Sequence, residues 1–201
     1  MMNLIFPTGR AYRVFQKTGN PWVTLILGLI AGLAMVLTFS SADAADFDIS
    51  GTGTVSWVAD GDTMTVTPSL PQLWGQLRSE AVRAQQATSR NLRVDDRFNR
   101  THKNFLTRIA VIDTAESNHP DDSRNTSAGD TASRYAKNLM TGKQVEFRCY
   151  EIGYYGRPIC SLETSDFDFG RHMIRQDMST YVTRYGNHPF EHEIYVRATR
   201  Q

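Results

Sequence analysis

Residues 51–67 read GTGTVSWVADGDTMTVT, a stretch of strand-forming residues on both sides of a short turn sequence. Valine, threonine and tryptophan dominate on both sides of the ADGD tetrapeptide, as is typical of β-strands. Aspartate and glycine supply the backbone conformations that a tight turn needs. The stretch therefore predicts two short strands joined by a bend, and it places Asp62 in that bend.

The strand pattern resumes further along the chain. Residues 105–112 (FLTRIAVI) predict a strand with one embedded charge, Arg108, and an embedded charge needs a partner. Residues 144–150 and 158–163 predict a hairpin around the sequence EIGYYGR. Residues 117–130 contain only loop-forming residue types, so a surface loop is expected there.

Helices are expected between and after these strands. Residues 131–140 carry apolar side chains at helical spacing, and Gly142 follows as a stop signal. Two further helices are expected at residues 169–178 and 189–199. The order of elements indicates an α+β domain, an OB-like five-stranded antiparallel β-barrel with about three helices.

Residues 68–103 interrupt the strand pattern and read as an inserted segment. Apolar side chains recur there on one helical face, which the side of the barrel, a partner chain or a membrane surface would cover. They are Leu70, Leu73, Trp74, Leu77, Ala81 and Ala84. Seven basic residues against three acidic ones give the segment a local charge of +4. That surplus indicates either an arm that touches phosphates outside the active site or a solvated helix face.

The first 44 residues differ in composition from the rest. Three basic residues precede residues 22–39, eighteen uncharged and mostly apolar positions, and Ala42-Asp43-Ala44 has the form that a signal peptidase accepts. We expect a signal peptide cut after Ala44 or, alternatively, an uncleaved membrane anchor. Either way, residues 45–201 form the folded domain outside the cytoplasm, periplasmic or secreted in the first case.

The overall charge of the chain does not indicate nucleic-acid binding. The chain has 22 basic and 21 acidic residues, and residues 45–201 alone have 19 and 20. Any attraction to phosphate must therefore be local. Cys149 and Cys160 flank the predicted hairpin, and an exported protein permits a disulfide between them; two buried free thiols are the alternative.

Five residues carry the chemistry. Asp62, Asp113 and Glu116 lie where predicted strands end or turn, and carboxylates gathered there offer the hard oxygen ligands that calcium needs. Arg108 and Arg157 can grip phosphate oxygens. Arg108 precedes Asp113 by five positions, which places the two on opposite faces of a regular strand unless a bulge or twist intervenes.

These residues occur in segments that resemble the staphylococcal nuclease family. The segments are ADGDT, RIAVIDTAES followed by NHP, GDTASRYAKNL, and KQVEFRCY with YYGRPI, in the family's order and approximate spacing. The resemblance covers about residues 55–185, apart from the inserted segment. It implies a calcium-dependent endonuclease that cuts DNA and RNA to 3′-phosphate products.

The resemblance also implies a role for each site residue. Asp62, Asp113 and the carbonyl of Thr114 would bind Ca²⁺, and Glu116 would activate or orient water. Arg108 and Arg157 would hold the phosphate, while Tyr155 and Tyr185 would contact the nucleotide. Ala115, Pro158 and Thr183 depart from the family pattern.

Two other functions remain open. One is an inert nucleic-acid-binding module, although the chain has all five of the candidate catalytic and metal-binding residues. The other is a membrane-tethered DNA-processing factor, which would share the chemistry and differ in attachment. His188 and His192 are four residues apart, but Pro189 lies between them, so we expect surface residues rather than metal ligands.

Overall fold

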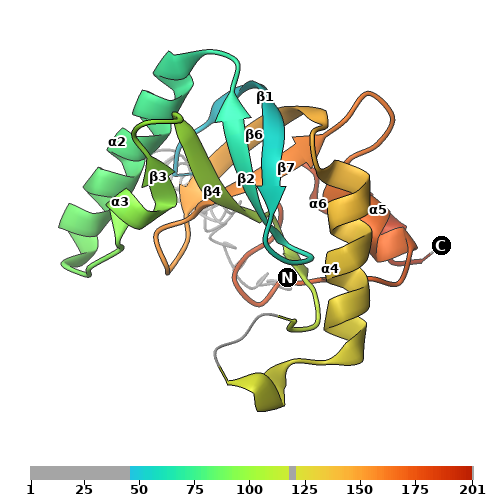
Figure 1. Ribbon diagram of the computed structural model, residues 1–201. Coiled ribbons are helices and arrows are strands. Elements are labelled where there is room, and N and C mark those ends of the chain that lie inside the picture. The colour runs from blue at the N-terminus through green and yellow to red at the C-terminus, as the bar shows by residue number, and fades with distance from the viewer. Residues whose placement is uncertain (1–45, 118–120, 201) are drawn as a thin grey trace, which may run out of the picture. The chain divides into compact units, whose positions relative to one another are not determined.

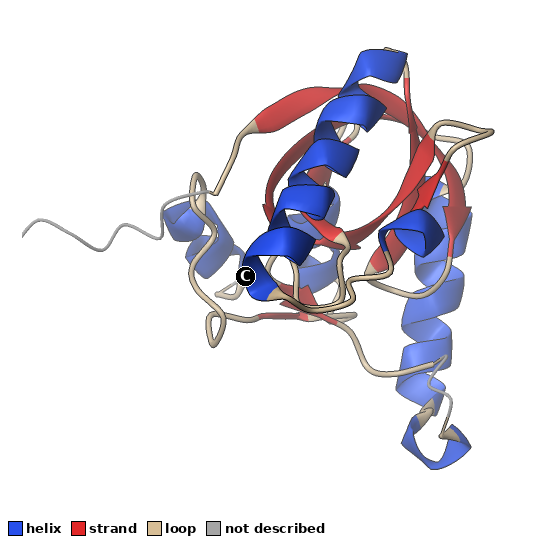
Figure 2. Ribbon diagram, turned by 90° about the vertical axis from the view of Figure 1, so that its left-hand side faces the viewer, coloured by secondary structure: helices blue, strands red, loops and turns tan. Residues whose placement is uncertain are grey.

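Five strands close into a barrel in the computed structural model, which describes residues 46–117 and 121–200 (Figures 1 and 2). The strands are β1 (Ile49–Val58), β2 (Thr63–Pro68), β4 (Asn104–Ile109), β6 (Gln144–Ile152) and β7 (Pro158–Glu163). Their order is β2-β1-β6-β7-β4, and pairing of β2 with β4 closes the ring. The bend at ADGD and the hairpin around EIGYYGR are where the sequence predicts them.

The barrel is mixed and not antiparallel as expected. Strand β4 runs parallel to β7 through the pairs Arg108–Ile159 and Ile109–Cys160, whereas the other four pairings are antiparallel. The reason is topological: strands that alternate in direction cannot close a ring with an odd number of members. One pairing of a five-stranded barrel must be parallel.

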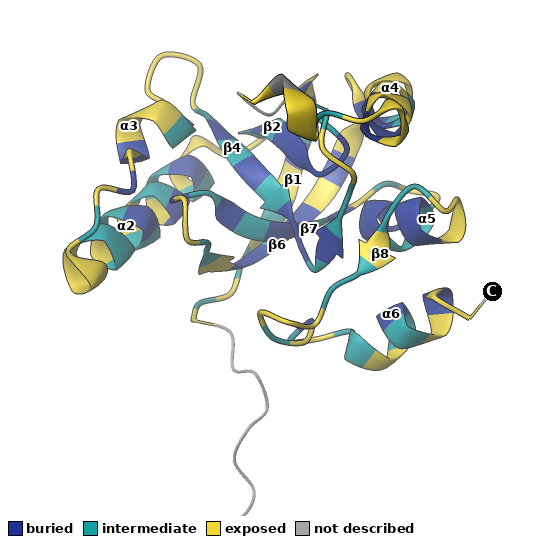
Figure 3. Ribbon diagram, turned by 90° about the horizontal axis from the view of Figure 1, so that it is seen from below, coloured by how far each residue is buried: buried dark blue, intermediate teal, exposed yellow. Residues whose placement is uncertain are grey.

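The inserted segment forms helix α2 (Pro71–Thr88), the short helix α3 (Val94–Arg97) and the short edge strand β3 (Phe98–Asn99), which pairs with β4. Helix α2 covers one side of the barrel, as Figure 3 shows by burial, with Trp74, Leu77 and Ala81 buried and Leu73 and Ala84 partly buried. Leu70 was expected on this face but is 53% exposed. It precedes the helix because Pro71 starts the first turn.

Three helices follow the inserted segment, and they correspond to the three that the sequence predicts outside it. They are α4 (Ser127–Met140), α5 (Phe169–Arg175) and α6 (His192–Ala198). Helix α4 starts four residues earlier than predicted because the Thr126 side chain caps it, accepting from Gly129 N at 3.0 Å. The predicted surface loop before it contains a short 3₁₀ turn, Asp122–Arg124.

The predicted signal peptide or membrane anchor is not tested by the described residues. Residues 22–39 and the cleavage position after Ala44 lie outside the described residues. Within those residues, no helix has the length and apolar character that crossing a membrane requires.

Cys149 and Cys160 form a disulfide across the β6–β7 pair, which confirms the expected bridge. Both residues are fully buried in the barrel. The bridge closes a short loop that contains Arg157, and closing a loop of this length is worth about 2–3 kcal/mol of stability. The covalent link therefore holds the loop that carries one of the two predicted phosphate ligands.

His188 is buried and not at the surface as the sequence indicated. Its ring stacks on Tyr195 with centroids 4.9 Å apart, and Nδ1 accepts from the backbone N–H groups of Phe190 and Glu191 at 3.3 and 3.1 Å. Because Nδ1 accepts, the neutral ring carries its proton on Nε2 and donates to Ser161 Oγ at 2.7 Å. Burial, together with the nearby charges of Arg148 and Arg171, lowers the pKa of His188 to about 4.

This histidine predicts an acid-sensitive fold. The unfolded chain binds a proton at His188 near its ordinary value of 6.5, whereas the folded chain does so only near pH 4, so stability falls as the pH drops through this window. The loss should reach about 3 kcal/mol at pH 4. Urea unfolding between pH 7 and 4 tests this, with His188→Gln expected to flatten the profile. His102→Gln, at an exposed position, should show the same dependence of stability on pH as the parent. If His188→Gln also shows the parent's dependence, His188 is not the acid-sensitive group.

Candidate functional site

The bend between β1 and β2 points Asp62 into the protein. This residue is almost completely buried, at 4% exposure. One carboxylate oxygen, Oδ2, accepts from the backbone N and the hydroxyl of Thr114 at 3.2 and 3.0 Å. A side chain on Gly61 would come within 2.7 Å of Thr114, so glycine is needed for this close approach. The bend and the segment after β5 (Ile112–Asp113) are thereby fixed to each other.

Burial makes the Asp62 carboxylate dependent on positive charge. Burial raises its pKa above 3.8, and Asp60 raises it further, whereas the Arg108 guanidinium and the hydrogen bonds from Thr114 lower it. A buried carboxylate stays ionised only where cations and N–H or O–H donors compensate its lost hydration. The site therefore favours a positive charge beside Asp62.

Arg108 supplies that charge and shares it with a second carboxylate. Its Nη1 lies 3.2 Å from Asp62 Oδ1, and its Nη2 lies 2.8 Å from Asp113 Oδ1. Nη2 also donates to the carbonyl of Ile112 at 3.2 Å. One guanidinium thus holds both predicted calcium-binding aspartates.

The predicted strand over residues 105–112 is interrupted, and the interruption makes this arrangement possible. Strand β4 ends at Ile109, Val111 adopts the left-handed conformation with φ +50°, and β5 begins at Ile112. In an unbroken strand Arg108 and Asp113 would face opposite sides, because side chains alternate. The break turns Asp113 back toward Arg108.

Arg157 joins the cluster through Thr63. It follows Gly156, whose φ is +79°, and its Nη1 donates to Thr63 Oγ1 at 2.8 Å. The same hydroxyl donates to Asp62 Oδ1 at 3.2 Å, so a single buried threonine links the arginine to the aspartate. Burial lowers the pKa of Arg157, as does the nearby Arg108, although a guanidinium remains charged at neutral pH.

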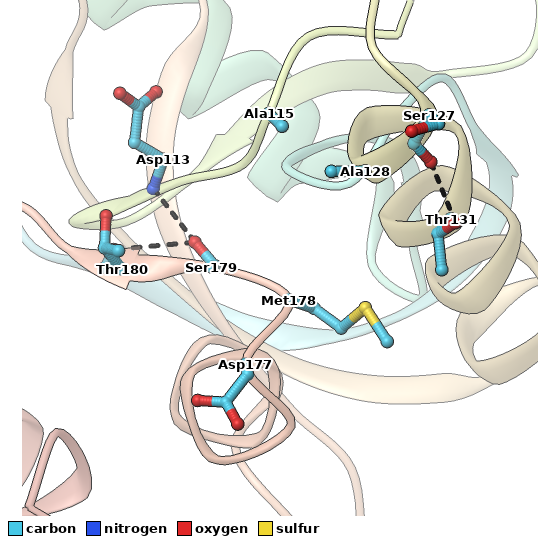
Figure 4. A pocket seen from close by; sticks show the side chains of 9 residues that line it. All are labelled: Asp113, Ala115, Ser127, Ala128, Thr131, Asp177, Met178, Ser179 and Thr180. Atoms are coloured by element: carbon cyan, nitrogen blue, oxygen red, sulfur yellow. Dashed lines mark hydrogen bonds between the residues drawn. The ribbon is translucent and has the colours of Figure 1, made fainter.

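Arg184 is a member of the cluster that sequence reasoning missed. Its Nη2 lies 3.0 Å from Asp113 Oδ2, so both oxygens of Asp113 contact guanidinium groups. The contact forms because β5 pairs with β8 (Thr180–Tyr181), and Ser179 Oγ accepts from Asp113 N at 3.1 Å (Figure 4). Thr63 was missed as well, although it is the last residue of ADGDT.

The Glu116 backbone is fixed but its side chain is exposed. Its carbonyl accepts from Thr126 N at 2.9 Å, and a Cβ on Gly129 would collide with that carbonyl. No hydrogen bond or ion pair to the Glu116 carboxylate is found within the described residues. Tyr155 and Tyr185 are 65% and 81% exposed. The structure thus joins Asp62, Arg108, Asp113 and Thr114 by direct contacts. Arg157 is linked to them through Thr63, and Glu116 and the two tyrosine rings lie at the surface.

The donor set suits a hard divalent cation. The carboxylates of Asp62 and Asp113 converge on one cationic group, so their oxygens face a common region, and the Thr114 carbonyl follows directly in the chain. Calcium prefers such oxygen ligands. Across residues 46–117 and 121–200, no three histidine, cysteine, aspartate or glutamate side chains gather as a metal cluster. A bound calcium would therefore also need water or phosphate oxygens as ligands.

A pocket of about 520 Å³ flanks the cluster on the side of Asp113 (Figure 4). Asp113 and Ala115 lie on one side of it, Ser127, Ala128 and Thr131 come from the start of α4, and residues 177–180 complete it. Asp62, Arg108 and Arg157 do not line it, so the pocket lies beside the cluster and does not contain it.

Comparison with known proteins identifies one family. Residues 107–201 match the family model described as staphylococcal nuclease homologue. No curated protein matches the chain. The matched part includes Arg108, Asp113, Glu116 and Arg157, whereas Asp62 lies before it and reaches the same cluster through its contacts with Thr114 and Arg108.

The link through Thr63 can be tested by stability. Thr63→Val keeps the shape of the side chain but removes the hydroxyl, so the half-buried Arg157 loses its acceptor and Asp62 loses a donor. We expect the free energy of unfolding in urea to fall by about 1–3 kcal/mol, and Thr63→Ser to retain most of it. A valine variant as stable as the parent would show that the threonine does not couple the two charges.

Proposed function

Residues 107–201 belong to the staphylococcal nuclease family, and from this premise we propose that the protein is a calcium-dependent endonuclease that hydrolyses DNA, RNA or both to 3′-phosphate products. A domain of this family indicates nuclease-type activity or nucleic-acid binding. Calcium dependence, the type of substrate and the products are the proposed part.

One observation carries the proposal: two carboxylates form one cluster with the guanidinium groups of three arginines. Asp62 and Asp113 share Arg108, and Thr63 connects Arg157 to Asp62. Both kinds of group promote phosphodiester hydrolysis, because carboxylates hold a metal ion and guanidinium groups hold the negatively charged phosphate. A surface patch of unrelated ion pairs would not bury an aspartate at 4% exposure.

Asp62, Asp113 and the Thr114 carbonyl are the groups proposed to hold calcium. When bound, calcium would neutralise charge on the phosphate and favour attack by water. Arg108 uses Nη1 and Nη2 on the two aspartates, and its remaining N–H donors can address a phosphate oxygen. Arg157 likewise uses one N–H on Thr63 and can present others.

Glu116 is the proposed base. Its exposed carboxylate takes a proton from water as the water oxygen bonds to phosphorus, and the bond from phosphorus to the 5′ oxygen breaks. The 5′ oxygen leaves with the bonding electron pair and takes a proton from solvent water, which gives a 5′-hydroxyl and a 3′-phosphate. Arg157 stabilises the negative charge that develops in this step, and the exposed rings of Tyr155 and Tyr185 contact the nucleotide.

The proposed location is outside the cytoplasm, with the domain either free after cleavage or tethered by residues 22–39. The buried Cys149–Cys160 disulfide supports it, because such bonds persist in oxidising compartments. Tethering would suit a DNA-processing factor with the same chemistry.

Incubation of the purified protein with plasmid DNA and with RNA, in calcium, magnesium or chelator, tests the proposal. We expect cleavage with calcium and none with chelator. Analysis of the product ends should find 3′-phosphates. Binding without cleavage under every metal condition would identify an inert nucleic-acid-binding module instead.

The catalytic roles predict large losses of activity without loss of folding. Glu116→Gln and Arg157→Ala should each lower kcat by several orders of magnitude, since one removes the base and the other removes charge stabilisation in the transition state. Glu146→Gln and Arg83→Ala, at exposed positions away from the cluster, are the matched controls. Activity of Glu116→Gln or Arg157→Ala within about tenfold of the parent would reject the assigned role.

The calcium ligands make a separate prediction. Asp62→Ala should weaken calcium binding at least about tenfold by calorimetry, because it deletes one of the few anionic ligands. Asp166→Ala removes an exposed carboxylate elsewhere and should leave the affinity unchanged. Equal calcium affinity in the parent and Asp62→Ala would remove Asp62 from the metal site.

A further inference from the structure

The arginines of the inserted segment fall into two groups. Four of them have acidic partners within the segment, which largely neutralise them. The pairs are Arg78 and Arg100 with Asp95, Arg93 with Asp96, and Arg83 with Glu80. Arg90 and Arg97 have no acidic partner in the part of the chain that the structure describes. Much of the segment's surplus positive charge is therefore carried at these two positions.

Both arginines contact the loop between β6 and β7. The Arg90 guanidinium lies over the Tyr154 ring, 4.2 Å from its centroid, and Arg97 Nε donates to the carbonyl of Tyr155 at 3.2 Å. A Cβ on Gly156 would lie 2.2 Å from the carbonyl oxygen of Leu92, so loop and segment are in close contact. Figure 1 shows this loop descending beside α3.

The contacts lead toward the candidate site. Arg157 follows Tyr155 by two residues, and Arg97 is near enough to contribute to lowering the pKa of Arg157, after burial and Arg108. Arg97, Arg157 and Arg108 thus form a series of positive charges that runs from the inserted segment to Asp62. A polyanion entering the site would meet these charges in turn.

The exposed rings indicate which polyanion fits. Tyr154 and Tyr155 are 69% and 65% exposed, and they meet edge to face with centroids 5.1 Å apart. Arg90 covers one face of Tyr154 and holds the ring in place. Aromatic rings beside unneutralised arginines are the combination that binds single strands, since unpaired bases stack on the rings while arginines contact phosphates. Duplex nucleic acid offers no free base faces except at its ends.

We propose that Arg90, Arg97 and Tyr154, the platform, bind single-stranded nucleic acid beyond the scissile phosphate. The inserted segment thereby lengthens the substrate site, and the enzyme prefers unpaired strands several nucleotides long. The proposal rests on the proposed function for the strand's path into the catalytic cluster. Binding at the platform can be measured without cleavage.

The test measures binding of the full-length protein to a fluorescein-labelled twelve-nucleotide oligothymidylate in chelator, with intact length verified on a gel. Arg90→Ala and Tyr154→Ala should each weaken binding by about tenfold. Arg90→Ala should also lower the slope of log affinity against log salt by about 0.7, the value for one phosphate contact on a single strand. Tyr154→Phe keeps the ring and should bind as the parent does.

Controls on the same segment separate the platform from general charge. Arg83→Ala and Arg93→Ala remove arginines that are paired with acids, and they should retain the parent's affinity. Parental affinity in Arg90→Ala and Tyr154→Ala would overturn the proposal. So would an equal loss in the two controls, an equal loss for a twelve-base-pair duplex, or a parent that does not bind the oligonucleotide.

Different results would reject the platform proposal and the nuclease proposal. A parent that binds the oligonucleotide through the platform but does not cleave it with calcium would keep the platform and reject the nuclease. If the parent cleaves the oligonucleotide and the platform variants bind it as the parent does, the nuclease proposal is kept and the platform is rejected.

Discussion

The guanidinium of Arg108 lies between two carboxylates, one buried and one half-exposed, and the arrangement of the candidate site depends on it. Asp62 is at 4% exposure, where an ionised carboxylate needs a cation and several donors. Arg108 provides the cation, and Thr114 and Thr63 provide the donors. Because Arg108 also holds Asp113, the bend at Asp62 and the segment after β5 form one unit. In the proposed function, calcium would share the aspartates with this arginine.

Closure of the barrel puts Arg108 in position. Strand β2 pairs with β4 so that Thr63 is opposite Arg108, and β4 pairs in parallel with β7 so that Arg108 is opposite Ile159. Strand β7 begins directly after Arg157, and the disulfide holds it to β6. The parallel pair that an odd-stranded barrel requires is thus the one that brings the β6–β7 loop beside the two aspartates.

The sequence predicted those parts of the structure in which one short segment determines its own conformation. The bend at ADGD, the apolar face of α2 and the hairpin with its disulfide follow from residue types at short spacing. The resemblance placed Asp62, Asp113 and Arg157 at one site, but other contacts between distant segments were missed. Arg184 is 71 residues from Asp113, and nothing near either residue signals their contact. His188 looked like a surface residue beside a proline, but its ring stacks in a buried position on Tyr195. The mixed barrel was predictable, since five strands cannot alternate around a closed ring.

In the proposed function, Asp62 and Asp113 form a calcium site beside Arg108, and a crystal structure of the protein soaked with calcium tests this proposal. We expect one calcium peak in anomalous difference maps, within about 2.3–2.6 Å of oxygens from both aspartates, with the Thr114 carbonyl as a further ligand. An Asp62–Arg108–Asp113 cluster without calcium at saturating concentration, or calcium bound only elsewhere, would contradict it.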